Sequence, residues 1–263
     1  MPVSKVHLHE CSVLDNEPVA DGLYRLVLKS PTLAKELSYG QFINVEVPGD
    51  TTQVLRVPLS FSLIDAPEEV VVVVYAVVGV GTRAISTLAC GEKISVVAPC
   101  GNPWRTHEGQ GRSIIVAGGA GITPIVGAAH MLSDAGIDFD AVVGAQTSGK
   151  LWGVDTMAIL GAGKTLVTTD DGTAGRRGFA TDALATLLAN GDVDTVYACG
   201  PEPMLAAVAK LTHEAGVACQ VSMERMMCCG FGACGTCNLA LKAGGYASVC
   251  MNGPIFDAEE VAW

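Results

Sequence analysis

Residues 113–132, SIIVAGGAGITPIVGAAHML, contain the turn that decides the fold. The stretch carries no Asp, Glu, Lys or Arg and has the length of a membrane span. The run Gly118 to Gly121 and Pro124 would interrupt one continuous helix, whereas a strand, a glycine turn and a helix account for every residue. Pro124 suits the start of that helix, where its missing N–H costs nothing. We therefore expect a strand, turn and helix of an α/β domain.

Downstream of residue 113, apolar runs alternate with Ala-rich helical patterns. The expected strands are SIIVAG, FDAVVGA, TLVTTDD and TVYACG, and the expected helices are PIVGAAHMLSDAG, ATDALATLLAN and EPMLAAVAKLTHEAG. This alternation predicts a parallel sheet with right-handed crossovers.

Upstream, short β-type runs at 23–30, 41–48, 70–78 and 93–99 are separated by Gly, Pro and Asp. They predict a small antiparallel barrel or sandwich. The last 45 or so residues are too few for a large core of their own, so we expect their cysteines to organise them. The predicted domains are 1–106, 107–217 and 218–263.

Composition narrows the function classes. With 263 residues, 49% hydrophobic and 16% charged, the chain is expected to fold, and disorder is excluded. A net charge of −11, from 16 basic and 27 acidic residues, argues against a nucleic-acid binder. Residues 1–18 hold no apolar run of the kind that directs secretion, so a cytoplasmic protein without a membrane partner is expected.

Ten cysteines without an export signal indicate thiol or metal chemistry rather than disulfides. Half of them are scattered through apolar surroundings, where buried small hydrophobic residues are expected: Cys11, Cys90, Cys100, Cys199 and Cys219.

The other cysteines form the most specific pattern in the chain. Cys229, Cys234 and Cys237, followed at a distance by Cys250, have the C-x4-C-x2-C spacing of plant-type [2Fe-2S] sites. Glycines interleave them, as a loop that wraps a cluster requires. A zinc site is the alternative, but zinc ribbons pair two C-x2-C knuckles and only one is present. The spacing favours an iron–sulfur cluster. Ligation by the adjacent Cys228 would lengthen the first gap.

Three polar or glycine turns follow strands of the predicted sheet: residues 118–123, 169–172 and 199–204. Ligands of open α/β sheets bind at the carboxyl edge of the strands, where these turns meet. We expect a nucleotide crevice there, with the pyrophosphate at a helix N-terminus.

The sequence motifs GGAGITP and CGPEPM resemble those of the nicotinamide-binding half of the ferredoxin reductase superfamily. The resemblance implies NAD(H) contacts from Gly118, Gly119, Gly121, Thr123, Cys199 and Gly200. It also places Cys199 beside the nicotinamide and the flavin, as a catalytic candidate. A small buried thiol is the alternative for Cys199.

The run Arg56, Val57, Pro58, Leu59 and Ser60 resembles the flavin motif of the same superfamily. The resemblance implies that the arginine meets the FAD pyrophosphate and that the Ser60 hydroxyl lies near flavin N5, as a second catalytic candidate.

Later segments also match the superfamily's flavin segments. These are Val74, Tyr75 and Ala76, and then Gly81 and Thr82. For Tyr75 alone, a place in the core is the better explanation. The turn at Gly81 and Thr82, with its hydroxyl at a helix start, suits a phosphate.

The blocks SMERMMCCGFGACGTC and VCMNGPIF resemble the C-terminal domain of the electron transfer subunit of type B dihydroorotate dehydrogenase. In that wording the ligand is the cysteine followed by glycine, which is Cys229 rather than Cys228. The resemblance implies NADH oxidation through FAD and a [2Fe-2S] cluster. It also implies a heterotetramer with an FMN-containing catalytic subunit of pyrimidine biosynthesis.

Two alternatives stay open. Val57 and Ala76 depart from the dihydroorotate pattern, and the Arg56 spacing resembles the small subunit of NADH-dependent ferredoxin:NADP oxidoreductase, which would serve ferredoxin or another dehydrogenase. The other alternative is a zinc-stabilised binding protein with no redox cofactor.

We expect NADH to be preferred over NADPH, because no basic residue follows the second strand at a suitable place for a 2′-phosphate. Arg176 and Arg177, after the next strand, could still reach that phosphate.

Overall fold

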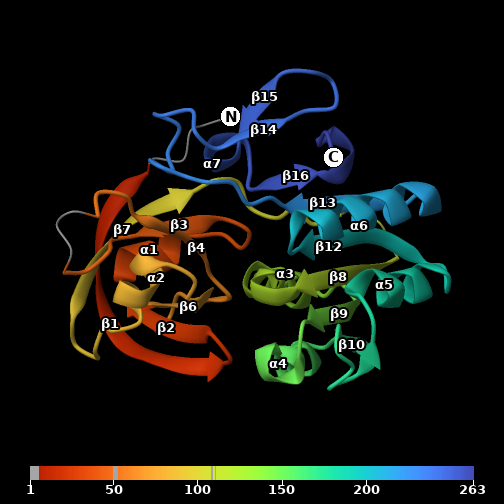
Figure 1. Cartoon of the computed structure of the whole chain (residues 1–263), viewed down its shortest axis with the longest axis horizontal. Coiled ribbons are helices and arrows are strands. Elements are labelled where there is room, and N and C mark those ends of the chain that lie inside the picture. The colour runs from red at the N-terminus through yellow and green to blue at the C-terminus, as the bar shows by residue number, and fades with distance from the viewer. Residues whose placement is uncertain (1–5, 50–52, 108, 110) are drawn as a thin grey trace.

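The computed structural model describes residues 6–49, 53–107, 109 and 111–263. The N-terminal part of the chain forms an antiparallel sheet. In sheet order its strands are β4 (Val57–Ser60), β3 (Phe42–Val45), β7 (Lys93–Cys100), β1 (His7–Ala20), β2 (Leu23–Lys29), β6 (Val70–Ala76) and β5 (Leu63–Asp65). Because β4 also contacts β6, the sheet curls into the expected barrel. The short helices α1 (Pro31–Glu36) and α2 (Val80–Ile85) accompany it (Figure 1).

Alternation along the strands builds the barrel core. In β6 the side chains of Val71, Val73 and Tyr75 point inward, where they meet Leu26 and Leu28 of β2. Burying each such side chain contributes about 1.5–3 kcal/mol, so the inward faces hold the barrel together. The outward faces of the same strands remain free to contact other parts of the chain.

The alternating pattern predicts a parallel sheet, and the second sheet is parallel except at one edge. In sheet order its strands are β11 (Arg176–Arg177), β10 (Thr165–Thr169), β9 (Phe139–Ala145), β8 (Arg112–Gly118), β12 (Val193–Cys199), β13 (Ala218–Ser222) and β16 (Ile255–Asp257). Its helices are η1 (Gly119–Gly121), α3 (Ile122–Asp134), η2 (Ser148–Lys150), α4 (Val154–Ile159), α5 (Ala180–Leu188) and α6 (Glu202–Ala215).

Helices cover both faces of this sheet. Ile114 and Val116 of β8 belong to the core that α5 and α6 cover, whereas Ile115 and Ala117 pack in the core under α3. The strands are therefore apolar on both faces, as expected for a parallel sheet between two helical layers.

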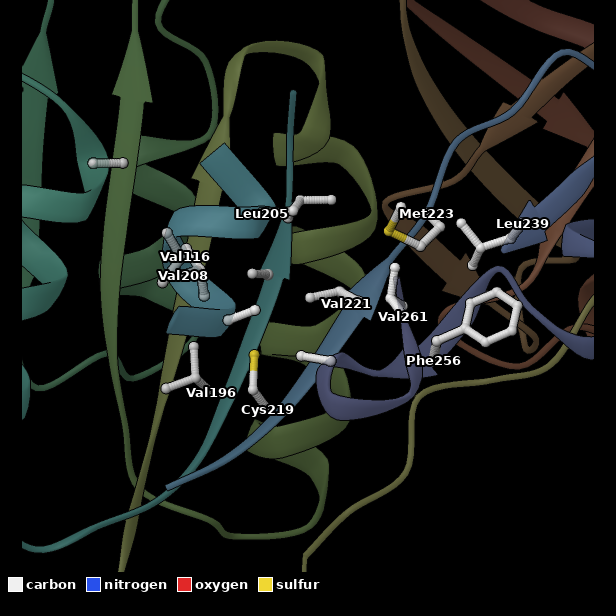
Figure 2. Packing of buried hydrophobic residues seen from close by; sticks show 14 of the residues in the cluster. Val116, Val196, Leu205, Val208, Cys219, Val221, Met223, Leu239, Phe256 and Val261 are labelled. Atoms are coloured by element: carbon white, nitrogen blue, oxygen red, sulfur yellow. The ribbon is translucent and has the colours of Figure 1, made fainter. Parts of the chain in front are cut away.

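The C-terminal unit lies across one end of the other two (Figure 1). It consists of the hairpin β14 (Asn238–Ala240) and β15 (Tyr246–Ser248), then α7 (Val249–Asn252), β16 and η3 (Ala258–Glu260). Its side chains share a core with α6 and β13, which Figure 2 shows through Val221, Met223 and Phe256. The parallel-rich sheet thus continues past residue 217, and the boundaries at 106 and 217 stay a prediction.

Two details differ from the sequence expectations. Four of the scattered cysteines are buried, but Cys90 is exposed, because it lies in the tight turn before β7 that ends at Gly91. The long strand β1 was not expected at all. Among the described residues, no helix has the length and apolarity to cross a membrane, and residues 113–132 form strand, turn and helix as predicted.

Candidate functional site

A cleft of about 620 Å³ lies at the carboxyl edge of the parallel strands. Its walls come from the glycine turn after β8, the ends of β9 and β10, and the first residues of α5 and α6. The barrel contributes Asp21, Leu23 and Ala76 to the same walls. The cleft is therefore formed by both domains, at the edge where the sequence predicts a nucleotide.

The charged groups of the cleft are mainly acidic. Asp21 and Asp170 line it together with Lys150, whose Nζ donates to Gln146 Oε1 over 2.6 Å. Arg176 and Arg177 are exposed on the edge strand β11 and are not among the residues that line the cleft.

The two predicted turns of the nucleotide site touch each other. A Cβ on Gly118 would lie 2.6 Å from Met204 Sδ, and one on Gly200 would overlap Met204 Cε and approach Gly118 Cα to 3.1 Å. A Cβ on Gly121 would overlap the Cys199 carbonyl. These three glycines are needed for the close approach of the turns. Gly119 meets nothing within 4 Å and lines the cleft.

Thr123 and Cys199 are placed away from the cleft surface. The buried Thr123 hydroxyl donates to the Val74 carbonyl over 2.7 Å and so ties α3 to the barrel. Cys199 is only 1% exposed, and burial raises the pKa of its thiol. At Cys199 the structure therefore matches the buried thiol that the sequence left as an alternative.

Further contacts join α3 to the barrel side of the molecule. Trp104 Nε1 donates to the Pro124 carbonyl over 3.1 Å, and the rings of Tyr39 and His130 stack with centroids 5.5 Å apart. Burial lowers the pKa of His130 in this contact. These contacts fix the barrel against the nucleotide turn.

The flavin candidates lie on β4, β6 and the start of α2. Arg56 donates to the carbonyl oxygen and the hydroxyl of Ser95 over 2.8 and 2.7 Å. Val57 lies under Gly81, where a Cβ would come within 2.8 Å of Val57 Cγ2. The structure thus brings the 56–60 run and the Gly81 turn together, as the resemblance implies for one flavin site.

The other flavin candidates are divided by strand alternation. The Tyr75 ring is buried inside the barrel, where its hydroxyl donates to Asn16 Oδ1 over 3.1 Å. Its neighbour Ala76 lines the cleft. Thr82 is buried, and its hydroxyl oxygen accepts the backbone N–H groups of Val78 and Gly79 at 3.0 Å. Ser60 is half-buried on β4.

The predicted cluster ligands lie on one loop and on α7. Cys229 Sγ accepts the Ala233 N–H at 3.2 Å, and Cys237 Sγ accepts the Cys250 N–H at 3.4 Å. Cys237 and Cys250 are buried, whereas Cys234 is exposed. The neighbouring Cys228 Sγ accepts the Thr236 hydroxyl at 3.5 Å.

The pKa values of these thiols reflect their contacts. Hydrogen bonds from Thr236 and from Cys229 lower the pKa of Cys234 to about 6. Burial, contact with Cys237 and the charge of Cys229 together raise the pKa of Cys250 to about 12. The four predicted ligands therefore influence one another, and Cys229 is linked to both Cys234 and Cys250.

The donor chemistry of this loop fits an iron–sulfur cluster. It supplies four thiols and two backbone N–H groups directed at sulfur, as cluster ligands require. Within the part of the chain that the structure describes, no three Cys, His, Asp or Glu side chains already have the arrangement of metal ligands. The fit therefore rests on the donor set and its hydrogen bonds.

A second cavity, of about 330 Å³, is lined by two charged residues that the sequence analysis does not identify. It lies between the two nucleotide turns and the start of the C-terminal unit, where Glu224 and Arg225 line it. Glu224 reaches solvent, but its carboxyl is deep enough for burial to raise its pKa. Arg225 donates to both carboxylate oxygens of Glu202, over 3.1 and 3.0 Å. A charged pair within the otherwise apolar run SMERMM was the available signal.

Comparison with known proteins agrees with this division of sites. Residues 115–210 match the oxidoreductase NAD-binding domain. Residues 224–262 match the iron–sulfur cluster binding domain of dihydroorotate dehydrogenase B. A chain of the NADH-dependent reduced ferredoxin-NADP oxidoreductase has a TM-score of 0.87 and 31% identity, over 96% of this chain and 90% of that one. The ferredoxin reductase of carbazole 1,9a-dioxygenase shares the fold, with a TM-score of 0.68 at 18% identity over 81% of this chain and 67% of that one.

Fold and site together define a ferredoxin reductase-like oxidoreductase with a C-terminal iron–sulfur domain. Curated relatives along the whole length make the assignment narrower. The electron transfer subunit of dihydroorotate dehydrogenase B (NAD(+)) from Bacillus velezensis is 34% identical, over 99% of this chain and 100% of that protein. The Fusobacterium nucleatum subunit is 31% identical, over 97% and 98%. The chain belongs to this family of electron transfer subunits, which confirms the resemblance drawn from its cysteine loop.

Proposed function

We propose that this chain oxidises NADH and passes the electrons through FAD and a [2Fe-2S] cluster to a catalytic partner chain. The observation that carries the proposal is the packing of the cysteine loop and α7, which together carry the four predicted ligands, on a barrel that also forms one wall of the nucleotide cleft. All three predicted sites thus lie in one compact arrangement. The domains 1–106, 107–217 and 218–263 would then each hold one of the three groups.

The cleft would hold NADH with its pyrophosphate over Gly119, while Gly118, Gly121 and Gly200 keep the two turns together. The Cys199 thiol is buried, so Cys199 would support the turn beneath the nicotinamide rather than touch it. Thr123 would act by holding α3 on the barrel.

The flavin would lie along β4 and the Gly81 turn. To bind the pyrophosphate, Arg56 would give up its hydrogen bonds to Ser95 and donate to the phosphate oxygens instead. The Ser60 hydroxyl would lie near the flavin ring. A bound flavin accepts a hydride and releases electrons singly, which joins nicotinamide chemistry to one-electron chemistry. Cys229, Cys234, Cys237 and Cys250 would hold the cluster.

The partner is proposed to be an FMN-containing dihydroorotate dehydrogenase chain, in a heterotetramer of two subunits of each kind. Support comes from the relatives, which are named as subunits of that enzyme. Orotate formation would then belong to the partner, in pyrimidine biosynthesis.

A second function rests on a specific observation. The chain of the NADH-dependent reduced ferredoxin-NADP oxidoreductase is 31% identical to this chain, the same identity as the Fusobacterium nucleatum subunit has. Together with the Arg56 spacing, this supports service to ferredoxin or another dehydrogenase.

The experiment is anaerobic purification of the whole chain, followed by flavin identification and measurement of iron and acid-labile sulfide. We expect FAD, iron and sulfide in the proportions of one [2Fe-2S] cluster, and bleaching of the flavin by NADH. A colourless protein that contains zinc and no iron would contradict the proposal and favour the zinc-stabilised binding protein.

A further inference from the structure

A buried amide on the outer face of the barrel touches the cysteine loop. On β3, Ile43 and Val45 point into the barrel core, so the intervening Asn44 points outward. An outward polar side chain on a barrel normally meets solvent, yet Asn44 is only 2% exposed. What covers it is the turn that carries Cys229.

Two contacts define this covering. A Cβ on Gly230 would overlap the Asn44 Nδ2 atom, so the turn lies directly on the amide. Asn44 Nδ2 also donates to Cys100 Sγ over 3.4 Å. The amide and the Cys100 thiol thus form a polar seat under the first predicted ligand.

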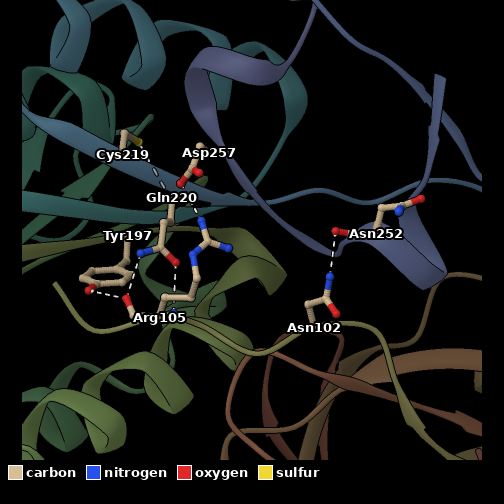
Figure 3. Close-up of polar contacts among 7 residues, drawn as sticks. All are labelled: Asn102, Arg105, Tyr197, Cys219, Gln220, Asn252 and Asp257. Atoms are coloured by element: carbon tan, nitrogen blue, oxygen red, sulfur yellow. Dashed lines mark hydrogen bonds and ion pairs between the residues drawn. The ribbon is translucent and has the colours of Figure 1, made fainter. Parts of the chain in front are cut away.

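A second attachment lies just beyond this seat. Asn102 donates its backbone N–H to the Gly253 carbonyl over 2.6 Å and its side-chain Nδ2 to the Asn252 carbonyl over 2.9 Å (Figure 3). Asn252 ends α7, the helix that carries Cys250. The segments with the first and last predicted ligands are therefore both fastened to the same end of the barrel.

We propose that Asn44 is a positioning residue for the cluster, which holds the turn of Cys229 and Gly230 at a fixed separation from the flavin barrel. This inference rests on the proposed function. Electron transfer depends steeply on the distance between the two groups, and hydrogen bonding and packing around the sulfurs tune the cluster potential. An amide seated on the flavin-side barrel controls both.

The test replaces Asn44 with Leu, which keeps the branched shape of the side chain, with bulkier methyl groups, and removes the donor. In the anaerobic holoprotein we expect NADH to reduce the flavin at the wild-type rate. Cluster reduction that follows should slow by about tenfold, which corresponds to about 1.4 kcal/mol, with a changed EPR spectrum and midpoint potential. The readouts are stopped-flow absorbance, EPR and a redox titration.

Matched glycine variants separate this contact from backbone strain. Gly230 and Gly235 both have positive φ, at 75° and 66°, but a Cβ on Gly235 meets nothing within 4 Å. Gly230→Ala should therefore disturb the cluster signals much more than Gly235→Ala. Combining Gly230→Ala with Asn44→Ala removes the overlap and should restore part of the signal.

Wild-type potential, EPR spectrum and transfer rate in Asn44→Leu would overturn the inference. If that variant does not retain iron, Asn44→Ser and Cys100→Ala take its place, and wild-type behaviour of both would be equally contrary. Wild-type protein without iron would instead contradict the proposed function, so the two failures are distinguishable.

Discussion

At the scale of single residues, neighbouring glycines in one motif have different tasks. Gly119 faces the open cleft. At Gly121, by contrast, the Cys199 backbone fills the space that a side chain would need. The resemblance assigns both to the cofactor, because sequence cannot show which glycine touches protein. Packing between turns and binding of a ligand require the same residue type.

Replacing Gly121 with Ala should therefore act mainly on stability. Gly121 has an ordinary helical φ of −61°, so only the collision with the Cys199 backbone is costly. Overpacking of this kind destabilises by about 1–3 kcal/mol. Chemical denaturation should show the loss, while Gly79→Ala, whose Cβ meets nothing within 4 Å, should stay near wild type. Equal stability of the two variants would contradict the assigned contact.

The adjacent cysteines provide a second residue-scale prediction. Cys229 is among the residues that shift the pKa values of Cys234 and Cys250, whereas Cys228 accepts a hydrogen bond from the Thr236 hydroxyl. Cys229→Ser should lose iron and acid-labile sulfide, and Cys228→Ser should retain both. Cys90→Ser is the exposed control outside the loop. Iron loss from Cys228→Ser alone would show that the neighbours were assigned the wrong way round.

At the scale of elements, the contact of α3 with the barrel contains a titratable group. Burial lowers the pKa of His130 below its ordinary value of 6.5, so the unfolded chain binds this proton more readily than the folded one. The free energy of unfolding is therefore unaffected by this group above pH 6.5, and it decreases as the pH falls from 6.5 to the pKa of His130 in the folded state.

His130→Gln should remove that part of the pH dependence. We expect the loss of stability between about pH 7.5 and pH 5.5 to be smaller in this variant than in wild type. Denaturant unfolding at both pH values measures it, with the exposed His213→Gln as control. An unchanged slope in His130→Gln would assign the acid sensitivity to other groups.

The cleft elements also predict nucleotide preference. Asp21 and Asp170 line the cleft, while Arg176 and Arg177 do not, so a 2′-phosphate would meet two carboxylates and Lys150. NADH should reduce the flavin at least about tenfold more efficiently than NADPH, a difference of about 1.4 kcal/mol. Asp170→Asn should narrow the gap in stopped-flow reduction. A wild-type preference for NADPH would refute the assignment.

Most elements of the parallel sheet follow from the sequence, because their strands are apolar on both faces and helices separate them. Strand β1 does not, since it is polar along its outward face and pairs with β7 in one half and β2 in the other. The residues that contact Arg56 and Asn44 also cannot be predicted from the sequence. Ser95 and Gly230 are far from them in sequence, and only the folded barrel brings them close.

At the scale of the whole molecule, one short segment joins all three units. The Arg105 carbonyl accepts hydrogen bonds from the Tyr197 hydroxyl and Gln220 Nε2, and its guanidinium pairs with Asp257 of β16 (Figure 3). Asn102, a few residues earlier, holds the segment after Cys250. The chain between barrel and parallel sheet is thus also an attachment for the C-terminal unit, which favours electron transfer at fixed geometry.

The same view of the whole molecule predicts a division of labour between chains. Oxidation of dihydroorotate needs a general base over a substrate held against flavin, and the cleft of about 620 Å³ at the sheet edge is proposed for nicotinamide. No histidine is among the described residues that line this cleft. His9 is hydrogen-bonded to Thr32, His130 stacks on Tyr39, and His213 is exposed beside Glu259. The isolated chain should therefore reduce artificial acceptors with NADH but should not form orotate.

Adding a separately prepared FMN-containing dihydroorotate dehydrogenase chain should produce NAD-linked oxidation of dihydroorotate. We expect a complex with the mass of two copies of each chain, and we expect Cys229→Ser to abolish the coupled reaction while NADH still bleaches the flavin. Orotate formed by this chain alone would contradict the division of labour. Inactivity with every such partner, together with NADH-dependent reduction of ferredoxin, would favour the second function, because the cofactor path would be intact and only the acceptor different.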